Sequence, residues 1–188
     1  MRRRKPIAFL CVGVMMCLVF SCMLSGCGYS TRAYVSKSGF RYIYIEPFVN
    51  KVDLTSEFSE GSRFKTYYPL LENVVTNAIV DRFNFDGGLK VSKEPEADVV
   101  LRGELIKYGR ESINDATDDT PQEYRITIFV KISLYDKRNN KVLWERPNFA
   151  GDTTYYTTGA YVTSESQAIK AATEDLARRI VELTVEAW

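Results

Sequence analysis

Hydrophobic side chains recur at every second position in several stretches of this chain, a spacing typical of β-strands that cover a core with one face. The clearest stretch is residues 124–135, whose inward positions are Tyr124, Ile126, Ile128, Val130, Ile132 and Leu134. A stretch after Pro95 places Ala97, Val99, Leu101, Gly103 and Leu105 on one face, and Asp98, Arg102, Glu104 and Tyr108 on the other. Residues 40–48 alternate up to Pro47, and residues 142–149 alternate after a polar turn at 136–140. The pattern predicts four strands.

Two other stretches have the spacing of three and four residues that is typical of amphipathic helices. Residues 67–85 carry the apolar stripe Leu71, Val74, Val75, Ala78, Ile79 and Phe83. Pro69 is expected in the first turn of this helix, and Gly87 and Gly88 are expected to end it. The last stretch follows Ser164 and Gln167, which fit a capping box. Its stripe is Ile169, Ala172, Leu176, Ile180, Leu183 and Ala187.

The order of these elements, β-α-β-β-β-α, predicts an α+β fold. We expect a two-layer sandwich in which both helices pack on one face of a four-stranded mixed sheet. Polar, turn-rich residues at 50–65 and 110–122 predict exposed loops, and the second of these is expected to join two strands as a hairpin. The face of the sheet without helices is then left with Arg41, Arg102, Arg125, Lys131 and several tyrosines.

Two segments have two interpretations each. The hydroxyl-rich aromatic residues 151–161 fit an ordinary loop beside the sheet, or a surface that contacts a partner through Tyr155 and Tyr156. In the hairpin, Asp115, Asp118 and Asp119 fit a solvated loop or a calcium site, although their spacing does not match an EF-hand loop. For Trp144 we expect packing in the core or at the sheet edge rather than a ligand platform.

The N-terminal residues change the picture of where the domain resides. Arg2 to Lys5 are basic and residues 7–24 are apolar, which together predict an export signal. The stretch Leu24-Ser25-Gly26-Cys27 resembles the lipobox of bacterial lipoproteins, and the alternative is an uncleaved membrane anchor. We therefore predict a signal peptide over 1–26, a lipidated N-terminus and tether over 27–38, and a single domain over 39–188. Gly28, which follows the acylated Cys27, implies sorting to the periplasmic face of the outer membrane.

Composition narrows the classes of function. The chain has 25 basic and 24 acidic residues, and four of the basic ones precede the predicted cleavage, so the mature chain has a net charge of −3. This charge does not favour nucleic acid as a partner. Histidine is absent from the sequence and all four cysteines lie at or before position 27, which disfavours a metal site, a cofactor and an enzyme. An enzyme would have to depend on carboxylates such as Glu46 and Glu104.

Several short motifs resemble the LptE family of lipopolysaccharide-assembly lipoproteins. They are Cys27-Gly28-Tyr29, Ile45-Glu46-Pro47-Phe48-Val49-Asn50, Ala97-Asp98, Tyr124-Arg125 with Tyr135-Asp136, and Val142-Leu143-Trp144-Glu145. The resemblance extends over nearly all of the mature chain. It implies a non-enzymatic protein, anchored by acyl chains such as palmitate, that acts as plug and assembly subunit of the lipopolysaccharide translocon inside the LptD β-barrel.

The resemblance also implies sites for two partners. Lipopolysaccharide phosphates would be bound by basic residues near the predicted hairpin, here Lys107, Arg110 and Arg125. The barrel would be contacted by Arg102, Lys131, Tyr155 and Tyr156, because a polar barrel interior suits charged and aromatic side chains. An alternative function is a free-standing periplasmic adaptor or envelope-structure lipoprotein without a barrel partner, since a fold does not fix a function.

Overall fold

The computed structural model of the chain describes residues 39–52, 68–86, 88–115 and 121–186, which belong to one compact unit. The predicted signal peptide, Cys27, Gly28 and the tether lie outside these residues. So do most of the predicted loop at 50–65 and the tip of the predicted hairpin. None of the helices in these ranges combines the length and the apolar composition of a membrane-spanning segment.

Two helices form one layer. The helix α3, Leu71–Asp86, buries Leu71, Val75, Ile79 and Phe83, and the longer α4, Glu165–Glu186, buries Ile169, Ala172, Leu176 and Ile180. The capping box of α4 is confirmed, because the Ser164 N–H donates to Gln167 Oε1 over 2.9 Å and the Gln167 N–H donates to Ser164 Oγ over 3.3 Å. The prediction that α3 begins near residue 67 is wrong. Leu70 has a φ of +60°, which is not helical, so Pro69 lies before the helix.

Six strands form the other layer. They are β1 (Tyr42–Ile45), β2 (Val49–Asn50), β3 (Lys90–Val91), β4 (Val99–Asp115), β5 (Pro121–Asp136) and β6 (Lys141–Tyr156), with a short 3₁₀ turn, η2, at Glu94–Glu96. The order in the sheet is β3-β1-β4-β5-β6, and β2 continues beside β4. Strands β4, β5 and β6 are antiparallel neighbours, whereas β1, β2 and β3 pair in parallel. The sheet is mixed, as predicted, and it has two more short strands than the sequence indicated.

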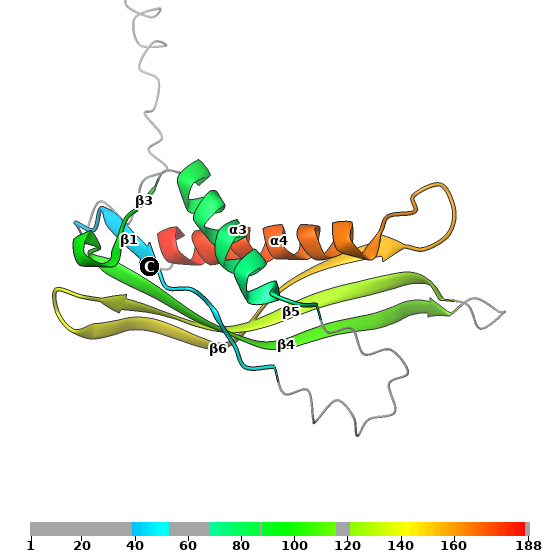
Figure 1. The fold of residues 1–188 in the computed structure, drawn as a ribbon, viewed down its shortest axis with the longest axis horizontal. Helices are drawn as coiled ribbons and strands as arrows, with labels where there is room; N and C mark the ends of the chain where they lie inside the picture. The colour runs from blue at the N-terminus through cyan, green and yellow to red at the C-terminus, as the bar shows by residue number, and fades with distance from the viewer. Residues whose placement is uncertain (1–38, 53–67, 87, 116–120, 187–188) are drawn as a thin grey trace, which may run out of the picture. The chain divides into compact units, whose positions relative to one another are not determined.

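Both helices pack on one face of the sheet, which confirms the predicted α+β architecture (Figure 1). The core between the layers takes the alternating residues of β5, and Ile126, Ile128, Val130 and Ile132 are fully buried. Trp144 is also buried in this core. The strand predicted over residues 40–48 is shorter than expected. β1 ends at Ile45, and the chain pairs with the sheet again at β2, after Pro47.

Two glycines allow close contacts in this sandwich. At Gly103 of β4, a Cβ atom would lie 2.1 Å from the ring of Phe48, so the missing side chain makes room for this aromatic residue. At Gly151 of β6, a Cβ atom would lie 2.5 Å from backbone atoms of Leu176 in α4. Helix α4 therefore rests directly on the sheet backbone at this point, which fixes the spacing between the two layers.

Candidate functional site

A β-bulge in β4 decides which face each candidate residue occupies. Leu105 pairs with Val130 and Lys107 pairs with Phe129, so Ile106 is one extra residue on β4. Before the bulge, the odd-numbered residues of β4 face the helices. After it, Tyr108 lies opposite the buried Ile128 and faces the helices instead. The prediction that Tyr108 lies on the same face as Arg102 is therefore wrong.

The same bulge separates the three residues predicted to bind lipopolysaccharide. Lys107 lies opposite Phe129 and Arg125 lies opposite Glu111, and these positions are on the face of the sheet without helices, the open face. Arg110 lies opposite the buried Ile126 and faces the helix layer. The structure thus brings Lys107 and Arg125 to one surface and places Arg110 on the other side of the sheet.

Arg110 is held by an aromatic and acidic cluster at the start of α4. Its guanidinium carbon lies 4.0 Å from the ring centre of Tyr124 and 5.8 Å from that of Tyr155, and the two rings stack on each other. Arg110 Nη1 lies 3.5 Å from Glu165 Oε2, and the Tyr108 hydroxyl donates to Glu165 Oε1 over 3.3 Å. We name these five residues the Arg110 cluster. It joins the end of β4 to the first turn of α4.

The ionisation of the Arg110 cluster suits a structural role. Burial, and then the carboxylate of Glu165, raise the pKa of Tyr108 above its usual range. Burial likewise raises the pKa of Tyr155. Both phenols therefore remain protonated near neutral pH, and a protonated phenol is a hydrogen-bond donor rather than a nucleophile or a general base.

The open face carries paired charges and aromatic rings. Arg102 Nε lies 3.1 Å from Glu46 Oε2, and Lys131 Nζ lies 2.8 Å from Glu145 Oε1. The hydrogen bond to Glu145 and the charge of that carboxylate raise the pKa of Lys131. The guanidinium of Arg102 also lies 4.9 Å from the ring centre of Tyr135. Such exposed ion pairs contribute little to stability, but they leave the face polar and close to electrically neutral.

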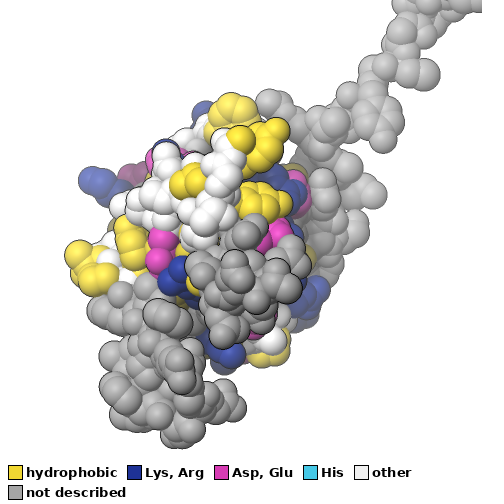
Figure 2. Space-filling view, turned by 90° about the vertical axis from the view of Figure 1, so that its right-hand side faces the viewer, with side chains coloured by type: hydrophobic (Ala, Val, Ile, Leu, Met, Phe, Trp, Pro, Cys, Tyr) yellow, Lys and Arg dark blue, Asp and Glu magenta, His cyan; other side chains and the backbone are white. Residues whose placement is uncertain are grey.

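The two tyrosines predicted to contact a barrel differ in their exposure. Strand β6 runs through both of them, so the loop interpretation of residues 151–161 is wrong for the residues up to Tyr156. Tyr155 is 3% exposed and belongs to the Arg110 cluster, which makes it unavailable to a partner in this conformation. Tyr156 is 41% exposed and bridges to Val162 in the connection to α4. Figure 2 views the end of the domain where the connection from β6 to α4 lies, and it shows hydrophobic side chains interspersed with acidic and basic ones.

The remaining candidates are a metal site and an enzyme that depends on carboxylates. Among the described residues, no group of three or more His, Cys, Asp or Glu is placed to hold a metal ion. Asp118 and Asp119 lie outside those residues, so the calcium interpretation of the hairpin stays a prediction. Glu46, one of the two carboxylates on which an enzyme could depend, is bound to Arg102.

Known structures share this fold at low sequence identity. A protein of Xanthomonas campestris is 12% identical with a TM-score of 0.53, and the match covers 78% of this chain and 84% of that one. A hypothetical protein of Chlamydia trachomatis is 13% identical with a TM-score of 0.51 over 77% and 95% of the two chains. A minor lipoprotein of Acinetobacter baumannii is 16% identical with a TM-score of 0.50 over 79% and 95%. At these identities the comparison shows the fold alone.

Sequence comparison is more specific. No curated protein sequence matches the chain. A family model described as lipopolysaccharide-assembly, LptE, matches residues 40–183, which include every described strand and nearly all of α4. That family consists of non-enzymatic assembly lipoproteins, which indicates a location in the cell envelope. Because the match covers far more than half of the sequence, this chain belongs to the LptE lipopolysaccharide-assembly family.

Proposed function

We propose that this chain is an outer-membrane lipoprotein that binds an LptD-type β-barrel and acts as the plug and assembly subunit of the lipopolysaccharide translocon. Membership of the LptE family supports this role. Acyl chains on Cys27 would hold the protein to the periplasmic leaflet, and Gly28 would direct it to the outer membrane. Several acyl chains are needed for stable anchoring, because one chain alone binds a membrane only marginally.

The open face of the sheet is the observation that carries the proposal. The helices cover the other face, so the open face of β4, β5 and β6 is left to a partner. It carries the ion-paired Arg102 and Lys131 and the ring of Tyr135. The interior of a barrel is polar, and a charged residue buried against it is costly unless it is paired. Arg102 and Lys131 already have carboxylate partners on the same face, so contact with a barrel wall would not leave them unpaired.

Lipopolysaccharide is the second proposed partner. Its phosphates require exposed cationic donors, and Lys107 and Arg125 provide them on the open face. These two residues stand about four positions apart along neighbouring strands, a separation of about 13 Å, which suits two anionic groups of one ligand. Arg110 takes no direct part in this proposal, because Tyr124, Tyr155 and Glu165 already occupy its guanidinium.

Photo-crosslinking in cells tests the contact with a barrel. A photoreactive amino acid at Ser133 would report from the open face, between Arg102 and Glu145, and one at Lys170 would report from the solvent side of α4. We expect an adduct of the size of an outer-membrane barrel from position 133, and little or none from position 170. Equal barrel adducts from both positions would contradict the assignment of the face. Absence of barrel adducts from both would support the alternative, a free-standing periplasmic adaptor.

A further inference from the structure

One end of the sheet collects three segments that are distant in sequence. The Lys90 N–H donates to the Arg41 carbonyl over 2.9 Å, the Asp98 N–H donates to the Tyr42 carbonyl over 2.9 Å, and the Lys137 N–H donates to the Asp98 carbonyl over 3.0 Å. Residues 40–42, 90–98 and 136–142 therefore lie together, and we name them the entry end. The chain enters the described domain at Gly39, next to this end.

The entry end is basic. It contains six basic residues, Arg41, Lys90, Lys93, Lys137, Arg138 and Lys141, against the four acidic residues Glu94, Glu96, Asp98 and Asp136, a net charge of +2. All the basic residues except Lys137 are exposed. Two of the acidic residues are turned inwards and already have partners.

Those two carboxylates serve the fold. Asp136 is 2% exposed and accepts hydrogen bonds from the backbone N–H groups of Arg138 and Asn139 in the turn between β5 and β6. Asp98 accepts hydrogen bonds from the backbone N–H groups of Arg41 and Tyr42 and from the guanidinium of Arg138. With Arg138 paired to Asp98, the exposed charges of the entry end are those of Arg41, Lys90, Lys93 and Lys141 against Glu94 and Glu96, so the net charge of its surface stays at +2.

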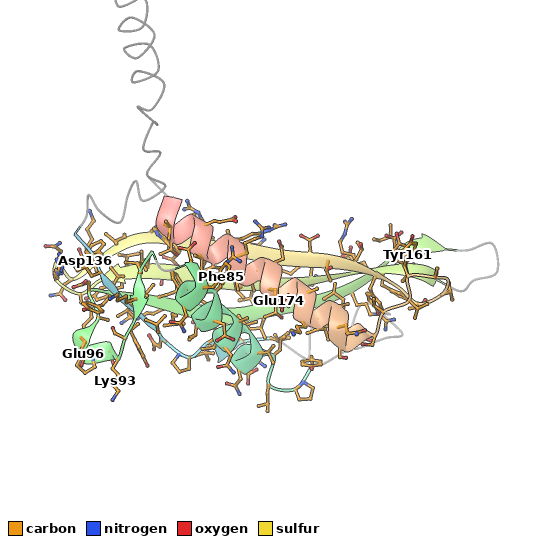
Figure 3. All side chains as sticks on the ribbon, turned by 90° about the horizontal axis from the view of Figure 1, so that it is seen from above. Phe85, Lys93, Glu96, Asp136, Tyr161 and Glu174 are labelled. Atoms are coloured by element: carbon orange, nitrogen blue, oxygen red, sulfur yellow. The ribbon has the colours of Figure 1, made fainter. Side chains whose placement is uncertain are left out.

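The opposite end of the sheet has the opposite sign. Strand β4 has 17 residues and separates the two ends by about 50 Å. At the far end, Arg110 and Arg125 are outnumbered by Glu111, Asp115, Glu123 and Glu165, a net charge of −2. Figure 3 shows the separation, with Lys93, Glu96 and Asp136 at one end and Tyr161 at the other. The domain thus has a charge polarity along β4, which an anionic surface would orient.

Two exposed apolar side chains accompany the basic residues. Tyr42 in β1 is 40% exposed and Val142 in β6 is 48% exposed. Each directly follows an exposed basic residue, Arg41 or Lys141. Tyrosine with lysine and arginine is the composition found where proteins meet the headgroup region of a bilayer.

We propose that the entry end docks onto anionic phospholipid headgroups of the leaflet that holds the anchor. The proposal rests on the lipidation of Cys27 that is part of the proposed function. A tether over residues 28–38 reaches at most about 36–40 Å when fully extended. The anchor therefore keeps the basic end within a short distance of the headgroups, and a contact that is weak in free solution becomes effective through its high local concentration. Docking would direct the far end of β4 away from that leaflet.

The test uses the full acylated protein in vesicles. A fluorophore on Glu96→Cys reports from the entry end and one on Thr158→Cys reports from the far end, while nitroxide-labelled headgroups act as quenchers. In vesicles of phosphatidylethanolamine and phosphatidylglycerol, we expect strong quenching at position 96 and weak quenching at position 158. In phosphatidylcholine vesicles, or when salt rises from about 0.1 M to about 1 M, quenching at position 96 should fall because screening shortens the Debye length from about 10 Å to about 3 Å.

Matched variants separate docking from net charge. The double variant Lys93→Gln with Lys141→Gln removes two charges at the entry end. Each lost charge should lower the ratio of docked to undocked protein about fivefold. Lys51→Gln with Lys170→Gln removes two exposed charges elsewhere, beside Leu105 and on α4, and should leave quenching at position 96 nearly unchanged. Equal effects of the two pairs, quenching that does not depend on phosphatidylglycerol, or equal quenching at both ends would each overturn the proposal.

The outcomes also separate this proposal from the proposed function. Protein that does not float with either type of vesicle lacks the anchor, and that result would contradict the lipidation on which both proposals rest. Normal headgroup quenching together with no barrel adduct in cells would contradict the role as a barrel partner and leave the docking supported.

Discussion

Leu176 of α4 lies directly over Gly151 of β6, and a Cβ atom at position 151 would be 2.5 Å from the Leu176 Cα and backbone nitrogen. Because this contact is with helix backbone, it cannot be relieved by a change of rotamer. Gly151→Ala should therefore lower the free energy of unfolding by about 1–3 kcal/mol, measured by chemical denaturation. Gly109→Ala is the control, because its nearest atom would be the Thr127 carbonyl oxygen at 3.9 Å. Equal stability of the two variants would show that the helix shifts easily on the sheet.

Arg110 is expected to stabilise the fold rather than to bind a ligand. Arg110→Ala removes the contact with Tyr124 and Glu165, and it should lower the free energy of unfolding by about 1–2 kcal/mol. Arg125→Ala, on the open face, should change it by less than about 0.5 kcal/mol. Denaturation midpoints of the two variants test this difference. A larger loss for Arg125→Ala than for Arg110→Ala would contradict the assignment of faces after the bulge.

The sequence could predict which face each residue of β4 occupies only as far as the bulge at Ile106. Period-two alternation identified the buried residues of β5 correctly, since a regular strand keeps its phase along its whole length. In β4 the phase changes at Ile106, which is neither glycine nor proline and looks like any other strand residue. A single extra residue moves every later side chain to the other face. This is why Tyr108 was predicted on the wrong face of the sheet.

Other differences arise from long-range pairing. The strands β2 and β3 have two residues each, too few for any periodic signal, and they exist because β4 and β1 offer them parallel partners. The aromatic segment at the end of β6 also contains many hydroxyl groups, which concealed a strand that pairs Tyr155 with Tyr124. The two helices, by contrast, could be predicted well, because their apolar stripes and the cap of α4 are local features.

The carboxylate of Asp98 predicts a dependence of stability on pH. Burial opposes its ionisation, but hydrogen bonds from the Arg41 and Tyr42 backbone and the nearby Arg138 lower the pKa of Asp98 below its usual 3.8. The folded state therefore favours the ionised form, and this stabilisation is complete above about pH 5 and is lost as the pH falls through the folded pKa. Denaturation midpoints from about pH 6 to about pH 2.5 should fall less steeply for Asp98→Asn than for the wild type. Parallel slopes would contradict the contribution of Asp98.

The predicted anchor is tested at Cys27. Cys27→Ala removes the only thiol that could be acylated at the predicted cleavage site, so metabolic labelling with a fatty acid should disappear and uncut precursor should accumulate. Gel mobility and radiolabel in the same membrane fraction measure both effects. Cys22→Ala is the matched control and should be labelled and processed normally. Labelling that persists in Cys27→Ala would show that residues 24–27 are not a lipobox.

Lipopolysaccharide binding is tested on the open face. Lys107→Glu with Arg125→Glu replaces two cations with anions on the surface opposite the helices, and repulsion from lipid phosphates should weaken binding at least tenfold. Lys170→Glu with Arg179→Glu makes the same change in charge on α4, although it also breaks the ion pairs of Arg179 with Asp152 and Asp175 and that of Lys170 with Glu174. Affinity is measured with purified lipopolysaccharide at fixed salt, and circular dichroism confirms folding. If the α4 variant loses as much affinity as the open-face variant, net charge alone sets the attraction and there is no site on the open face. A loss confined to the Lys107 and Arg125 variant supports a binding site on the open face, where both residues lie because of the bulge in β4.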